Sequence, residues 1–459
     1  MKRIIQFALV LFFLVSQIAY SQEYNFPSKG KIDYQLTMED EMMLDSLQAY
    51  TFKFFENEHD IEKGIVKDRA ASWAPASIAS TGFGLASFAI GAERNYVSRT
   101  EAARITLNIM RFFANSVQSA DTNATGYKGF YYHFLRLNDG RRTWKCELSS
   151  IDTGLLMMGV IFARNYYDLD NAVEDEIRAL AGLLLGRMDW SFLIHGSEGR
   201  FAHTISMGWT PEHGLHDFGW AGYNEGLFLY VLAAGTGLEN ADKSYEHWLK
   251  SYKWQTPYEG FSHVAFPPLF GHQFSQAFID YRGIADAYMK EKGIDYFENS
   301  RRATYVQQLY AIQNPKGWKG YDAKTWGVTA SDGPGDQYNF DDKKFLSYAG
   351  RGTSGPDYNY FDDGTIAPYG AASSLPFAPE IVFPTLRNFL TAYGNQIWGK
   401  YGFYDAFNPT ANWVDNDFIG IDQGPMLIMI ENFRTGLVWN NVMKDPIIQK
   451  GLNKLGFKP

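Results

Sequence analysis

The sequence predicts an all-α protein whose helices form a toroid, with an inner and an outer ring. Roughly a dozen segments carry apolar residues at helical spacing. Several apolar segments start at a glycine that follows a polar or acidic residue, and Gly82, Gly154 and Gly226 are spaced equally, since 154 − 82 and 226 − 154 are both 72. One further amphipathic segment lies between each pair. This alternation predicts repeated pairs of one apolar inner helix and one polar-faced outer helix.

The predicted helices have start signals as well as periodicity. In the first of them Thr37 can cap the chain and three acidic residues follow it. In chain order, the predicted helices span residues 37–58, 78–90, 99–120, 151–167, 172–190, 226–234, 241–252, 276–292, 296–313, 378–392, 424–433 and 442–455. Aromatic, glycine-rich loops separate many of them. We expect short β-hairpins in these loops, for example at residues 129–137.

The first 21 residues have the layout of a secretory signal. Lys2 and Arg3 precede an apolar run over residues 4–15, and small residues follow at Ala19 and Ser21. The run is too short to span a membrane comfortably, and no other segment approaches such a span. No linker rich in Pro, Ser or Gly interrupts the remaining chain. We therefore expect export to the periplasm or the medium, and a single domain over residues 22–459.

Composition excludes some partners and suggests others. The net charge of −9 disfavours nucleic acid, whose phosphates would be repelled. Cys146 is the only cysteine, so no intrachain disulfide can form. Aromatic residues make up 17% of the chain, which fits either a large core or flat apolar surfaces for a ligand. We expect a monomer that binds an oligo- or polysaccharide and has no membrane span.

Residues 208–226 read GWTPEHGLHDFGWAGYNEG and lead into an apolar helix. The stretch is too polar for a core and too aromatic for a solvated linker, which predicts one wall of a sugar-binding cleft. Asn224 suits an N-cap and would place Glu225 in the first helical turn, where the helix dipole favours the ionised form. Trp220 and Tyr223 could desolvate the carboxyl and raise its pKa. A general acid requires that the desolvation dominates.

Three further acidic residues are candidates for chemistry. Glu147 lies upstream of a serine cap, so the helix dipole does not explain it, whereas Asp152 falls in the first turn of the next helix. Asp405 lies in an aromatic loop, and Asp422 is either an N-cap or a cleft residue. If the inner helix starts converge, these acids and Glu225 share one mouth. Paired carboxylates in an aromatic cleft are the equipment of glycoside hydrolysis.

Other chemistries lack their motifs. The sequence has no HExxH zinc helix, no G-x-S-x-G nucleophile elbow and no phosphate-binding loop. Asp415, Asp417 and Asp422 could in principle hold Ca²⁺, but they do not follow an EF-hand pattern. We therefore expect neither a metal nor a cofactor.

Five long motifs resemble the glucoamylase-like domain of glycoside hydrolase family 144, the bacterial β-1,2-glucanases. They are WKCELSSIDTG (144–154), GWAGYNEG (219–226), DDGTIAPYGAASSLPFAPE (362–380), YGFYDAF (401–407) and WVDNDFIGIDQGPMLIMIENFRTG (413–436). The resemblance implies a single (α/α)6 toroid that cleaves β-1,2-glucan by inversion and without a cofactor. Glu225 and Glu147 match acidic positions of the family's catalytic cleft, although the motifs do not settle which group is the base.

We assign Glu225 as the general acid, with Glu147, Asp405 and Asp422 as alternatives for the group that activates water. Predicted sugar-stacking residues are Trp220, Tyr223, Trp326, Tyr369 and Trp413, and predicted hydroxyl-binding residues are Asp152, Asn224 and Arg351. The alternatives are a hydrolase of another β- or α-glucan, a polysaccharide lyase on a similar toroid, and a non-catalytic glycan-binding protein. Endo and exo cleavage are not distinguished, because a loop that closes one end of the cleft would decide between them.

Overall fold

The computed structural model describes residues 34–338, 343–355 and 360–459, and these are mostly helical. The predicted signal at residues 1–21 lies outside the described residues. Within the described ranges, none of the helices is both long enough and apolar enough to pass through a membrane. An all-α architecture with short β pieces is confirmed.

The helices are, in chain order, α2 (Met38–Asn57), α3 (Ile78–Glu93), α4 (Arg99–Asn115), α5 (Ser150–Tyr166), α6 (Ala172–Gly186), α7 (Leu227–Thr236), α8 (Ala241–Leu249), α9 (Phe270–Ala277), α10 (Ala287–Lys292), α11 (Tyr296–Gln313), α12 (Pro368–Ala372), α13 (Pro379–Asn388), α14 (Gly394–Ile397), α15 (Gly420–Arg434), α16 (Leu437–Met443) and α17 (Pro446–Lys454). The strands are β1 (Ala76–Ser77), β2 (Gly126–Tyr127), β3 (Phe130–Tyr132), β4 (Phe134–Leu135), β5 (Leu148–Ser149), β6 (Gly208–Thr210), β7 (Gly214–Leu215), β8 (Trp254–Gln255), β9 (His263–Val264), β10 (Ala330–Ser331), β11 (Ala349–Gly350), β12 (Trp398–Gly399), β13 (Gly402–Phe403), β14 (Phe407–Asn408) and β15 (Trp413–Val414).

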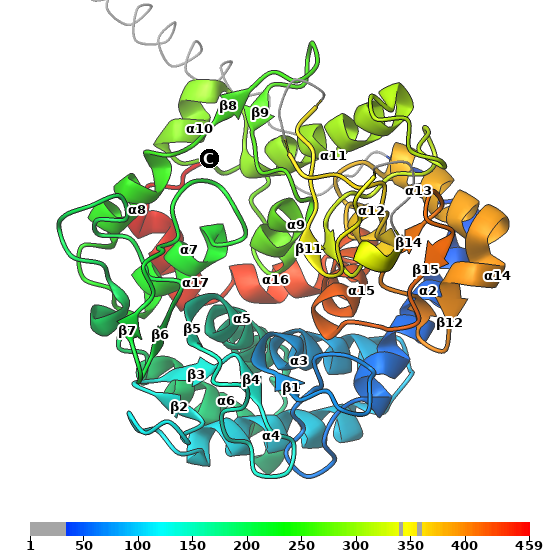
Figure 1. Cartoon of the computed structure of the whole chain (residues 1–459). Helices are drawn as coiled ribbons and strands as arrows, with labels where there is room; N and C mark the ends of the chain where they lie inside the picture. Colours follow the sequence, from blue (N-terminus) through cyan, green and yellow to red (C-terminus); the bar gives the residue numbers. More distant parts are fainter. Residues whose placement is uncertain (1–33, 339–342, 356–359) are drawn as a thin grey trace, which may run out of the picture.

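Helices of the described chain alternate between two rings, as predicted (Figure 1). The inner ring runs α3, α5, α7, α9, α12 and α15, and neighbours in this order are in contact, with α15 closing the ring against α3. The helices α2, α4, α6, α8, α11 and α13 alternate with them along the chain and pack outside. The last helices, α16 and α17, pack against α5 and α7.

Burial explains which helices go inside. In α3 every residue from Ile78 to Gly91 is buried, and α7 is buried from Leu227 to Gly235. An all-round apolar helix is stable only when other elements surround it, so these sequences require an inner position. The outer helix α4 buries only one face, and none of its charged residues is buried.

The repeated glycines serve close packing between inner helices. Gly82, Gly154 and Gly424 each occupy the fifth position of their helix, in α3, α5 and α15. A Cβ atom added to Gly82 would lie 2.5 Å from the backbone oxygen of Leu155, and one on Gly424 would lie 2.4 Å from Cβ of Phe83. Such distances exclude any larger side chain, so the glycine positions set how near the inner helices approach.

Two predicted helices are wrong because the structure interrupts them, and others end earlier, such as the one predicted at 99–120, which ends at Asn115. The segment predicted at 276–292 is interrupted after α9, because Gly283 adopts φ 70° and Asp280 pairs with Arg282 in the intervening turn. The segment predicted at 442–455 is split between α16 and α17, where Asp445 caps a new helix that begins at Pro446. By contrast, the predicted Thr37 cap is confirmed, with its side chain accepting a bond from the Asp40 backbone N–H.

A small sheet lies at the end of the inner ring where α3 and α5 begin. The strands are ordered β2-β3-β5-β6-β7, and β5 pairs with β3 through Tyr131 and Ser149 before leading into α5. On the other side, β1 leads into α3 and pairs with β4 through Ala76 and Leu135. The residue between β3 and β4, His133, therefore lies at the N-terminal ends of both α3 and α5.

Candidate active site

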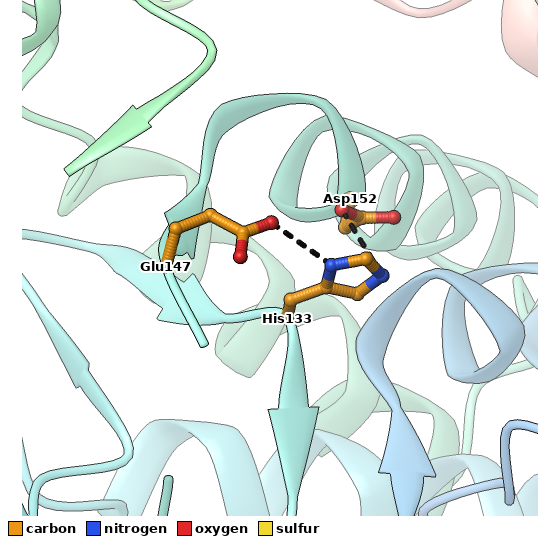
Figure 2. A group of neighbouring side chains, drawn as sticks. All are labelled: His133, Glu147 and Asp152. Carbon is orange, nitrogen blue, oxygen red and sulfur yellow. Dashed lines mark hydrogen bonds and ion pairs between the residues drawn. The ribbon is translucent and has the colours of Figure 1, made fainter. Parts of the chain in front are cut away.

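His133 joins two of the predicted acids at the mouth of the ring. Its Nδ1 lies 2.9 Å from Oε1 of Glu147, and its Nε2 lies 3.6 Å from Oδ2 of Asp152. Figure 2 shows the imidazole between the two carboxylates, with Glu147 arriving from the segment before β5 and Asp152 from the start of α5. Asp152 is also held by Ser149, whose Oγ donates to it at 2.5 Å.

The three groups shift one another's protonation. Although burial opposes its charged form, the carboxylates of Asp152 and Glu147 raise the pKa of His133 to about 9. Burial likewise opposes the ionised form of Glu147, but the bond from His133 holds the pKa of Glu147 below its usual value. Glu147 is therefore an ionised carboxylate at neutral pH, next to an imidazolium.

This ion pair predicts a pH-dependent contribution of His133 to stability. Because the folded-state pKa is raised from 6.5 to about 9, the contribution is fully present below pH 6.5 and is lost as the pH rises through 9. We expect His133→Asn to lower the free energy of unfolding by roughly 3 kcal/mol near pH 6, and by much less above pH 9. Chemical denaturation at both pH values measures this. His213→Asn, in an exposed loop, is the control, and an equal loss for His133→Asn at both pH values would contradict the ion pair.

Glu225 lies one residue before the N-cap of α7 and is half-buried. The prediction that Asn224 is the N-cap is wrong, because Gly226 takes that position and the Asn224 side chain instead accepts a bond from the Gly226 backbone N–H. Glu225 is thus outside the first helical turn. Burial, and then the charge of Asp152, raise the pKa of Glu225 to about 7. The desolvation effect therefore dominates, as a general acid requires.

A second acidic group surrounds the start of α15. Asp422 lies in the first turn of that helix, whose N-cap is Ile419, so the N-cap role considered for Asp422 is wrong. Burial and the charge of Asp422 raise the pKa of Asp405 well above its usual range. Burial also raises the pKa of Asp422 to about 7. Among the described residues no donor reaches Oδ1 of Asp405, which fits one proton shared between the two carboxyls.

Arg69 ties this second group to the first. Its Nη1 donates to Asp332 at 2.8 Å and to Asp417 at 3.3 Å, and the Asp332 backbone N–H donates to Asp405 at 2.7 Å. The preceding residue, Asp68, interacts electrostatically with both His133 and Asp417. Its backbone oxygen accepts a bond from the first residue of α15. The starts of α3, α5, α7 and α15 therefore bring the predicted acids close to one another.

Among the residues that the structure describes, two sets of side chains could hold a cation. The ligand atoms of His133, Glu147 and Asp152 lie within 4.8 Å of one another, as do those of Asp332, Asp405 and Asp415. A metal on the first set would have to displace the proton that its two carboxylates stabilise on the imidazole. The expectation that no metal is needed stays a prediction.

Several residues predicted to bind sugar serve the fold instead. Arg351 is fully buried and directs its guanidinium to Asp363 and to backbone carbonyls, so it has no free N–H for a sugar hydroxyl, and this prediction is wrong. Tyr223 is buried and stacks on Tyr296 at 5.6 Å, and Trp220 donates to Ser150. These rings pack on protein.

The remaining predicted aromatic residues differ in exposure. Trp326 is fully buried. Tyr369 is buried, and its hydroxyl donates to the Ala330 backbone oxygen at 2.6 Å. Only Trp413 is half-exposed. Its role in stacking a sugar stays a prediction.

Sequence reasoning missed His133 and Asp332. His133 follows a β-strand in the aromatic run GFYYHFL, which carries no catalytic motif. The predicted hairpin at 129–137 is wrong, because β3 pairs with β2 and β5, and β4 pairs with β1. The sequence therefore carried no signal that placed His133 beside Glu147. Asp332 gave no signal either, because its loop is placed by contacts with Arg69 and Asp405, which are distant in sequence.

The chain is similar to several known proteins. The Glycoamylase family model, described as "Putative glucoamylase", matches residues 217–446, which is half of the chain. An exo β-1,2-glucooligosaccharide sophorohydrolase (non-reducing end) of Parabacteroides distasonis is 28% identical over 447 residues, covering 91% of this chain and 58% of the relative. The chain thus spans less than two thirds of the length of that curated relative.

Solved structures agree over nearly the whole chain. A crystal structure from Bacteroides uniformis, with the same glucoamylase description, is 30% identical with a TM-score of 0.79, covering 93% of this chain and 99% of that one. An endo-β-1,2-glucanase from Chitinophaga pinensis, in complex with sophorotriose and glucose, is 26% identical with a TM-score of 0.79 and the same coverage. The chain therefore belongs to the glucoamylase-like family, and the resemblance to glycoside hydrolase family 144 that its motifs predicted is confirmed.

Proposed function

We propose that this protein is an exported glycoside hydrolase that cleaves β-1,2-glucan and sophoro-oligosaccharides with inversion at the anomeric carbon. The observation that carries the proposal is the contrast between Glu225 and Glu147, which both interact electrostatically with Asp152. The pKa of Glu225 is raised to about 7 and that of Glu147 is lowered. Two carboxyl groups whose surroundings push their pKa values apart are suited to the roles of acid and base. The relatives with β-1,2-glucan in their names support the substrate class.

Glu225 acts as the general acid in this proposal. Its protonated carboxyl donates to the oxygen of the bond between C1 of one glucosyl unit and O2 of the next. The bond to C1 breaks, and the departing sugar leaves as an alcohol. Burial favours the neutral carboxyl until it gives up its proton.

Glu147 acts as the general base. It takes a proton from a water molecule that attacks C1 from the face opposite to the departing oxygen, which yields the α-anomer of the new reducing end. Inversion in this way requires room for the water, so we expect a carboxyl separation of about 6.5–9.5 Å in the working enzyme. His133 keeps Glu147 ionised and fixes its orientation, and is a positioning residue.

Asp405 and Asp422 are weaker candidates for the base. Both are buried, with exposures of 2% and 3%, and their pKa values are raised. Because the two carboxyls share a proton near pH 7, the pair is less available to accept one from water than Glu147, whose pKa is lowered. In the proposed mechanism the pair shapes the far side of the opening.

One incubation tests the proposal against its alternatives. Linear β-1,2-, β-1,3- and α-1,4-glucans are supplied separately, products are sized, and proton NMR follows the first anomer formed. We expect cleavage of β-1,2-glucan alone, with α-anomer released first. Cleavage of another glucan would show that the assigned substrate is wrong. An unsaturated product would indicate a lyase, and binding without cleavage would indicate a glycan-binding protein that is not an enzyme.

The same assignment predicts a bell-shaped pH profile. Activity requires Glu147 ionised and Glu225 protonated, so kcat/KM should fall on the acid side below pH 4.5 and on the alkaline side above about pH 7. His133 stays protonated up to about pH 9 and does not set the alkaline limb. Profiles on sophorotriose measure this. Because Asp422 also has a pKa of about 7, Asp422→Asn is the matched variant, and loss of the alkaline limb in it would assign the limb to Asp422.

A further inference from the structure

Two exposed tryptophans lie near Arg69 and His133. Trp73 and Trp144 have exposures of 64% and 56%, and their ring centroids are 6.1 Å apart with an interplanar angle of 45°. Trp73 precedes β1 and Trp144 precedes β5, the strands that lead into α3 and α5. Large aromatic rings left in water are costly, and a pair of them forms an apolar surface of the kind that ligands cover.

Both rings are held by residues of the acidic opening. The guanidinium of Arg69, which also pairs with Asp332 and Asp417, lies 5.8 Å from the centre of the Trp73 ring. The Trp144 ring packs on Phe134 at 5.1 Å, and Phe134 stacks on His133 at 3.8 Å. Trp73 thus contacts Arg69 of the second acidic group, and Trp144 reaches His133 of the first group through Phe134.

A polar hollow adjoins Trp144. Its volume is about 490 Å³, within the range of sites for small ligands. Lys145, Arg136, Asn123 and Glu212 contribute to its lining, and Glu212 is fixed by two bonds from Arg142 at 2.8 and 3.0 Å. The hollow therefore offers donors and acceptors directly beside an aromatic face.

We propose that Trp73 and Trp144 form an outer subsite that stacks a glucosyl unit of the β-1,2-glucan, with the hollow beside Trp144 binding hydroxyls of that sugar. A pyranose presents an apolar C–H face and a rim of hydroxyls, which matches aromatic rings next to charged and amide groups. The rings reach the acidic groups indirectly, through Arg69 and Phe134, so we expect the subsite to contact long chains and not short ones. This inference rests on the proposed function for the identity of the sugar.

The test compares long and short substrates. In the wild-type background, the double variant Trp73→Ala/Trp144→Ala should raise KM for β-1,2-glucan of about ten units by about tenfold. The same variant should leave kcat/KM for sophorotriose unchanged. Replacing the alanine at position 144 by phenylalanine, in Trp73→Ala/Trp144→Phe, should restore part of the affinity for the long glucan. Leu169→Ala is the control, because Leu169 is 51% exposed and follows the opposite end of α5. Circular dichroism and Tm establish that each variant is folded.

Binding separates this inference from the proposed function. Calorimetry in the Glu225→Gln background should show about tenfold weaker binding of the long glucan, but not of sophorotriose, when both tryptophans are replaced. An unchanged KM and affinity for the long chain would overturn the subsite, and so would an equal loss for short and long substrates. Absence of hydrolysis by the wild-type protein would instead overturn the proposed function.

Discussion

Replacing Glu225 by glutamine is expected to lower kcat on β-1,2-glucan by about three orders of magnitude. Glutamine has nearly the same shape but no acidic proton, so the departing oxygen would leave as an alkoxide. The position is half-buried and its carboxyl has a pKa of about 7. The neutral amide therefore replaces a group that is partly neutral at pH 7 already, and the fold should tolerate it.

The leaving group distinguishes loss of an acid from loss of the site. In a nitrophenyl β-sophoroside the departing group is a stabilised nitrophenolate, which needs little protonation, so Glu225→Gln should lose far less activity on this substrate than on the glucan. Calorimetry with sophorotriose should show that binding is retained. Equal losses on both substrates, or full activity on the glucan, would remove Glu225 from the role of acid.

Glu147→Gln is expected to have the second largest effect, a fall in kcat of about two to four orders of magnitude on both substrates. The reason is that water attack limits both reactions when no carboxylate accepts the proton. An amide at this position also leaves the His133 imidazolium with only one of its two carboxylate partners. The pKa of His133 should fall accordingly, which NMR titration of the imidazole measures.

Chemical rescue identifies the position of the missing base. Azide needs no deprotonation and should restore turnover of Glu147→Gln on the nitrophenyl substrate, giving an α-glycosyl azide. Asp405→Asn and Asp422→Asn are the matched variants on the other side of the opening. If azide rescued either of these variants and not Glu147→Gln, the general base would be assigned to the acidic group around α15.

The ring architecture could be predicted because it depends on local and repeated features. An apolar helix that starts near a glycine predicts both burial of the helix and close approach of a neighbouring helix. Gly82 and Gly424 allow such close approach in the structure. The break between α9 and α10 could not be predicted, since the residues around it continue an apolar pattern. There, Gly283 with its positive φ overrides the periodicity.

The acids could be predicted because they precede or begin inner helices, whereas their partners could not. His133, Arg69 and Asp332 come from loops whose positions depend on contacts between distant parts of the chain. The sugar-stacking predictions were poorer for a related reason. Aromatic residues in a motif look alike in sequence whether they pack inward, as Trp326 does, or outward, as Trp144 does.

The most direct measurement is a crystal structure of Glu225→Gln with a β-1,2-glucan oligosaccharide bound. If carboxyls from separate inner helices cooperate at one mouth, the amide at position 225 lies within hydrogen-bonding distance of a bridging O2 oxygen. A water held by Glu147 then faces the adjoining C1 from the other side. A saccharide bound away from these two residues, or a water held only by the carboxyls near α15, would contradict the account.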